Sequence, residues 1–75
     1  MPARFYEELG DRLHSARIRK DYSLQDVAEK MGKSRKTILN WETGRHKIDM
    51  DVLSDLCGVL DLNVRELVDE CTQYL

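Results

Sequence analysis

The segment that most constrains the fold runs from Ser23 to Gly44 and reads SLQDVAEKMGKSRKTILNWETG. Ser23 is a favourable helix N-cap, and Asp26 three residues later can return the bond that completes a capping box. Apolar residues then recur at helical spacing up to Gly32, a residue type that adopts the left-handed conformation after a helix most easily. Ser34 predicts a second N-cap and a second short helix that runs to Gly44. The segment therefore predicts two short helices joined by a tight turn.

Two short helices joined in this way form a helix-turn-helix. Ile38 and Trp41 make the apolar side of the second helix, so the opposite side should face outward. The outer face could be an ordinary solvated surface, but the whole register favours a DNA-facing helix. The small Ala28, which permits close helix crossing, stands four residues before Gly32, and Ile38 and Trp41 follow Gly32 by six and nine residues. The outer face carries residues whose side chains suit base edges and phosphates: Ser34, Arg35, Lys36 and Asn40.

The segment resembles the helix-turn-helix of the phage lambda-repressor and Cro family, also called the XRE type. The similarity extends over about residues 9–67. Two motifs carry it. They are L-A-x-x-x-G, matched by Val27-Ala28 with Gly32, and W-E-x-G, matched by Trp41-Glu42 with Gly44. The resemblance implies a repressor, a Cro-like switch protein or a controller protein of a restriction-modification system.

The predicted DNA contacts fall into two groups. We expect Arg35, Lys36 and Asn40 to reach base edges, because Arg and Lys favour guanine acceptors and Asn favours adenine. The family often places a phosphate-binding Gln at the first position of its second helix, where this chain has Leu24, followed by Gln25. In the resembling proteins the loop after the motif touches the DNA backbone. The expected backbone contacts are Ser23, Gln25, Ser34, Thr37, Arg45, His46 and Lys47.

Charge is distributed unevenly along the chain. The net charge of −2 argues against nucleic-acid binding at face value, but residues 1–47 carry +4 and residues 48–75 carry −6. Residues 33–47 alone hold five cations against a single acid, Glu42. A local basic surface is typical of proteins that bind phosphates. The acidic C-terminal part should therefore face away from DNA.

The first helix is expected from about Arg4 to Lys20, with an apolar stripe through Leu9 and Leu13. Arg17 continues this stripe one turn after Leu13, where a charge is unfavourable. One interpretation is an arginine at a fraying helix end whose head group reaches solvent. The resemblance implies instead that Arg17 pairs with Glu42, and we expect a partly buried bridge between them.

Two further helices are predicted in the C-terminal part. Asp49 should cap one, and Asn63 with Glu66 should form a capping box for the other. The last helix has more apolar residues than one short core needs, and Tyr74 and Leu75 have no obvious partner within the chain. A frayed terminus would explain the tail, but we expect a homodimer through Val64, Val68, Tyr74 and Leu75.

Several classes of protein are not supported by the sequence. Cys57 and Cys71 are expected to be buried or half-buried free thiols rather than a disulfide, and neither they nor the histidines have the spacing of metal ligands. The chain has no apolar run long enough for a membrane span, and its start does not resemble a signal peptide. We found no catalytic motif, cofactor motif or small-molecule site, so an enzyme is not expected and a cytoplasmic protein is the simplest interpretation.

The sequence thus predicts an all-α fold, a compact five-helix bundle formed by one DNA-binding domain over residues 1–75, with its motif at about 23–44. The predicted function is sequence-specific binding of double-stranded DNA by a homodimeric transcriptional regulator on a near-palindromic operator. The alternative is a protein-interaction module on the same scaffold, such as an antitoxin or anti-repressor partner, because a fold alone does not decide function.

Overall fold

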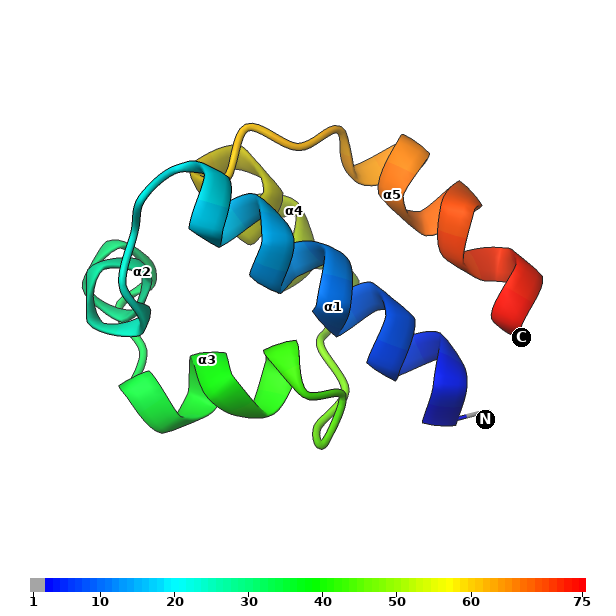
Figure 1. Ribbon diagram of the computed structural model, residues 1–75, viewed down its shortest axis with the longest axis horizontal. Helices are drawn as coiled ribbons and strands as arrows, with labels where there is room; N and C mark the ends of the chain where they lie inside the picture. The colour runs from blue at the N-terminus through cyan, green and yellow to red at the C-terminus, as the bar shows by residue number, and fades with distance from the viewer. Residues whose placement is uncertain (1–2) are drawn as a thin grey trace.

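Five α-helices follow one another in the computed structural model, which describes residues 3–75 (Figure 1). They are α1 (Ala3–Arg19), α2 (Leu24–Met31), α3 (Arg35–Glu42), α4 (Met50–Val59) and α5 (Val64–Cys71), followed by a short 3₁₀ helix, η1 (Thr72–Tyr74). The predicted all-α five-helix architecture is confirmed. Met1 and Pro2, the first residues of the predicted domain, lie outside the described residues.

The predicted motif begins and turns at the expected residues. The hydroxyl of Ser23 accepts a hydrogen bond from the Asp26 amide at 3.0 Å, and the Asp26 carboxylate accepts one from the Ser23 amide at 2.8 Å. Gly32 ends α2 in the left-handed conformation with φ +66°, and its N–H reaches the carbonyls of Ala28 and Glu29. Ser34 then caps α3 by accepting a hydrogen bond from the Thr37 amide at 3.1 Å. These local bonds satisfy amides and carbonyls that helix ends otherwise leave without partners.

The caps of α4 and α5 differ from the prediction. Asp49 stands at the N-cap position of α4, but its side chain takes no part in the cap. The Asp51 carboxylate instead accepts a bond from the Val52 amide at 3.0 Å. Half of the expected box on α5 is present, since Asn63 accepts a bond from the Glu66 amide at 3.0 Å.

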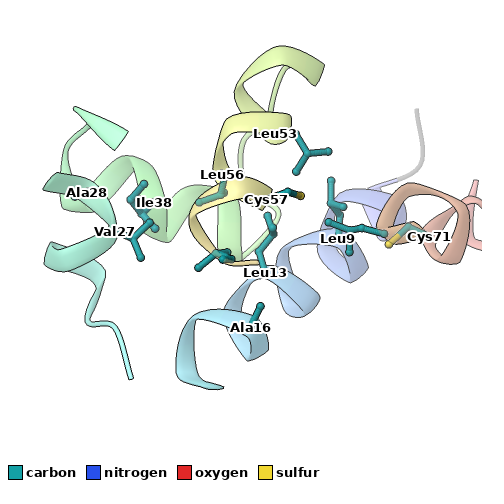
Figure 2. Close-up of a cluster of buried hydrophobic side chains, with 12 residues drawn as sticks. Leu9, Leu13, Ala16, Val27, Ala28, Ile38, Leu53, Leu56, Cys57 and Cys71 are labelled. Atoms are coloured by element: carbon teal, nitrogen blue, oxygen red, sulfur yellow. The ribbon is translucent and has the colours of Figure 1, made fainter. Parts of the chain in front are cut away.

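The hydrophobic core is built around α1, which crosses the middle of the bundle with α3 on one side and α5 on the other (Figure 1). Figure 2 shows Val27, Ala28 and Ile38 of α2 and α3 grouped at one end of this core, and Leu9 and Cys71 at the other. Trp41 is half-buried and packs on the edge of the cluster. The buried side chains are Leu9, Leu13, Ala16, Val27, Ala28, Ile38, Leu53, Leu56, Cys57, Leu60, Leu67 and Cys71.

Both cysteines are buried free thiols, as predicted. Burial raises the pKa of Cys57 and of Cys71, because a thiolate loses its hydration there. Each therefore acts as a small apolar residue of the core.

Two glycines bring α1 and the end of α3 together. A Cβ added at Gly10 would lie 2.5 Å from the carbonyl oxygen of Glu42, and closer still to that of Trp41. Gly44 follows α3 with φ +74°, and a Cβ there would lie 2.7 Å from Cα of Glu7. Backbone therefore meets backbone at this crossing, and α1 fixes the position of α3.

Tyr74 has a partner within the chain, so the expectation that it has none is wrong. The η1 turn brings its ring back onto α1, where the guanidinium of Arg4 lies 4.8 Å from the ring centre and that of Arg12 lies 5.8 Å from it. These are cation–π contacts. Leu75, in contrast, is 60% exposed.

Candidate nucleic-acid interface

The candidate interface is centred on the outer side of α3. Burial of Ile38 in the core sets the rotation of this helix about its own axis. Arg35 and Lys36 in its first turn are exposed, and Asn40 one turn later is half-buried. The three predicted base-contacting residues therefore lie on one short helix, with two of them at its N-terminal end. Residues near the N-terminus of a recognition helix are those that meet base edges when such a helix enters the major groove.

Ser34 and Thr37 form a hydroxyl pair at the start of α3. Their side-chain oxygens lie 2.8 Å apart, and Ser34 also accepts the Thr37 amide. The amides of the first turn of α3 have no acceptor within the helix, which gives this end a partial positive charge. Such an end attracts phosphate oxygens. The geometry is compatible with the predicted role of both residues as backbone contacts, which stays a prediction.

The basic loop is attached to the end of α3. Arg45, His46 and Lys47 are all exposed. The amides of Arg45 and His46 donate to the carbonyl oxygen of Asn40, at 3.0 and 3.3 Å. Gly44 permits this reversal through its positive φ. These bonds hold the exposed loop, with its two cations Arg45 and Lys47, beside the helix that carries Arg35 and Lys36.

The two predicted backbone contacts at the start of α2, Ser23 and Gln25, are already engaged within the chain. Ser23 takes part in the capping box with Asp26, and the Gln25 amide donates to the Glu29 carboxylate at 3.0 Å. Hydrogen bonds from the amide and then the hydroxyl of Ser23 lower the pKa of Asp26, so its negative charge persists close to this end of α2. Two carboxylates therefore lie beside these contacts, whose role in DNA binding stays a prediction.

Arg17 and Glu42 form a buried ion pair that joins α1 to α3. Nε of Arg17 lies 2.6 Å from Oε2 of Glu42, and Nη2 lies 3.1 Å from Oε1. The side chains are 9% and 6% exposed. Because two parallel bonds hold the carboxylate, the pair also restrains the end of α3 against α1.

Two further groups complete this ion pair, and sequence reasoning missed both. Nη1 of Arg17 donates to the carbonyl oxygen of Tyr22 at 2.9 Å, and Nδ1 of His14 lies 2.8 Å from Oε1 of Glu42. His14 could have been found from the sequence, since it precedes Arg17 by three residues and shares its side of the helix. The Tyr22 carbonyl could not, because its position depends on the loop between α1 and α2.

The ion pair changes the electrostatics of the candidate interface. Glu42 is the single acid in residues 33–47, and Arg17 neutralises it inside the fold. The remaining charges of this stretch are cations on exposed residues: Lys33, Arg35, Lys36, Arg45 and Lys47.

The predicted dimer residues lie at the other side of α1 from α3 (Figure 1). Val64 and Val68 of α5 pack half-buried against the core, and Tyr74 is half-buried against α1. Leu75 is the exposed member of the set.

Residues 3–75 contain neither a candidate membrane span nor a candidate metal cluster. In this part of the chain no helix has the length and apolar character needed to cross a bilayer. The same residues contain no cluster of three or more His, Cys, Asp or Glu side chains suited to hold a metal ion.

Comparison with known proteins gives concordant matches. The profile of a family described as "Helix-turn-helix" matches residues 13–67. A protein of Thermococcus kodakarensis, assigned by name to the HTH-type transcriptional regulatory proteins, is 33% identical over 60 residues. The match covers 80% of this chain but 19% of that protein, so the chain spans about a fifth of the length of this relative.

Three solved structures are similar over most of their length. The clp gene regulator ClgR from C. glutamicum superposes with a TM-score of 0.83 at 27% identity, covering 93% of this chain and 90% of that one. The restriction-modification controller protein C.AhdI from Aeromonas hydrophila gives 0.76 at 27% identity, with coverages of 83% and 94%. SinR, a master regulator for biofilm formation solved in complex with DNA, gives 0.73 at 31% identity, with coverages of 81% and 98%.

Proposed function

The chain belongs to the XRE-type helix-turn-helix family and has the DNA-binding fold of its transcription regulators, and from this premise we propose that it binds a near-palindromic DNA operator as a homodimer. The observation that carries the proposal is the exposed cationic surface of α3 and the loop behind it. Neutralisation of Glu42 by Arg17 leaves this surface without an acid of its own between residues 33 and 47. Residues 1–75 would then act as one DNA-binding domain.

In this proposal α3 lies in the major groove. Arg35 and Lys36 donate to guanine acceptors, and the Asn40 amide pairs with an adenine. Contacts to phosphates position the helix without reading sequence. The proposed backbone contacts are Ser23, Gln25, Ser34, Thr37, Arg45, His46 and Lys47.

A dimer is supported by the small size of the reading surface. One helix the length of α3 reads only a few base pairs, and doubling the site is the usual remedy. Pairing through α5 and the tail, by Val64, Val68, Tyr74 and Leu75, would leave both α3 helices free because α5 lies across α1 from α3 (Figure 1). The two reading helices should then lie about 34–36 Å apart, on half-sites about one helical turn of DNA apart.

The test is selection from a pool of random duplexes, followed by affinity measurements at several salt concentrations. We expect enrichment of an inverted repeat, and a log–log salt slope that reflects several released counterions. Repression would be read from a reporter that carries the enriched site in its promoter. A pool without enrichment, together with a flat salt dependence, would contradict the proposal and support the protein-interaction module instead.

A further inference from the structure

Leu39 is an exposed apolar residue on the helix proposed to read DNA. Its exposed fraction is 45%, although the preceding residue, Ile38, is fully buried. We propose that Leu39 is a specificity-determining residue that contacts the C5-methyl group of a thymine in the major groove. This inference rests on the proposed function and adds one base contact to it.

The position of Leu39 on α3 is fixed by backbone bonds. Its carbonyl oxygen accepts hydrogen bonds from the amide and from the hydroxyl of Thr43, both at 3.0 Å. The last turn of α3 is therefore held in place, and the direction in which the Leu39 side chain leaves the helix is held with it. Because nearly half of the side chain stays exposed, packing in the core does not account for a leucine at this position.

The neighbours of Leu39 indicate what should cover it. Helical spacing places Arg35 and Lys36 one turn before it and Thr43 one turn after it. Both cations are exposed. An apolar protein surface that covered Leu39 would also have to cover these charges, at a high desolvation cost. The major groove avoids this cost, because phosphates and guanine acceptors can meet the cations while an apolar group meets the leucine.

Thymine supplies that apolar group. Its methyl is the apolar feature of the major-groove code, whereas the other features are hydrogen-bond donors and acceptors. The side chains of α3 then form a complementary set. Arg35 and Lys36 suit guanine, Asn40 suits adenine, and Leu39 suits thymine.

The experiment uses the full chain and the duplex selected from the random pool. Each thymine of one half-site, on either strand, is replaced in turn by deoxyuridine, which lacks only the methyl group. Affinity is measured by fluorescence anisotropy at one salt concentration. Loss of one buried methyl contact, about 0.8 kcal/mol, corresponds to an affinity about fourfold weaker. We expect this loss at one thymine for the unmodified protein and no loss at that position for Leu39→Ala.

A matched control is available on α1. Ile18 is exposed to 52% and lies outside the helix-turn-helix, so Ile18→Ala should retain the fourfold sensitivity to deoxyuridine. The role of Leu39 is overturned if the selected half-site contains no A·T pair, if no deoxyuridine affects the unmodified protein, or if Leu39→Ala shows the same loss. A pool without any enriched sequence, together with a flat salt dependence, contradicts the proposed function itself, whereas an enriched sequence without a methyl effect overturns only the role of Leu39.

Discussion

Removing one member of the Arg17–Glu42 pair should strongly destabilise the fold. Arg17→Met keeps a long apolar stem but leaves the Glu42 carboxylate buried, with its side chain only 6% exposed. The substitution also removes the donor from the Tyr22 carbonyl. Breaking a buried ion pair in this way costs about 3–5 kcal/mol. A domain of this size has a total free energy of unfolding of about 4–11 kcal/mol, so the substitution should remove a large part of the stability of the fold.

The measurement is urea and thermal unfolding followed by circular dichroism, with Glu42→Gln as the variant on the other side of the pair. A loss of about 3–5 kcal/mol in a domain of 60–100 residues corresponds to a fall in melting temperature of about 12–40 °C. The urea m-value should stay unchanged if the unfolded state is unaffected.

Lys20→Met is the matched control for this prediction. Lys20 and Asp61 also lie 2.6 Å apart, but their side chains are 33% and 73% exposed. Water screens that pair, so its removal should move the melting temperature far less. If Arg17→Met and Glu42→Gln melt within a degree or two of the unmodified protein, the buried pair contributes little to the stability of the fold, contrary to this prediction.

Four further predictions follow from the site and the packing. Arg35→Ala should weaken binding to the selected operator by about 1–3 kcal/mol and relax the preference at one base pair per half-site, and equal weakening on random duplex would show that it contacts only phosphate. Lys47→Ala should weaken binding to every duplex and make the salt slope shallower by about one unit, so an unchanged slope would place it outside the interface. Gly10→Ala should lower the free energy of unfolding by about 1–3 kcal/mol, because the added Cβ would meet carbonyl groups at the end of α3. Gly58→Ala, where an added Cβ meets nothing within 4 Å, should raise the free energy of unfolding by about 0.8–1.0 kcal/mol. If both variants change the free energy of unfolding in the same direction, this packing is contradicted. Leu75→Glu should shift sedimentation toward monomer and weaken operator binding while the helical signal is retained, and a variant that stays dimeric would place the interface elsewhere.

The local structure of the motif could be predicted from the sequence because its determinants lie within a few residues of one another. Ser23 and Asp26 bond across one helical turn, Gly32 needs no neighbour to adopt a positive φ, and Ser34 bonds to the amide three residues ahead. The predictions were less accurate where several side chains compete for the same amides at a helix start. Asp49 was expected to cap α4, but Asp51 takes an amide of the first turn instead.

The sequence alone determined the five helices, the apolar sides of α1, α2 and α3, and the presence of a cationic stretch after Gly32. Only the tertiary structure decided how these parts meet. Gly10 approaches residues at the end of α3 that lie more than thirty positions away in the sequence. Tyr74 contacts arginines of α1 that lie more than sixty positions away. The exposure of Leu39 likewise depends on how α3 is rotated against the core. Capping and periodicity act within one or two turns of the chain, whereas a helix crossing depends on the side chains of both helices at once, and no single stretch of sequence contains both.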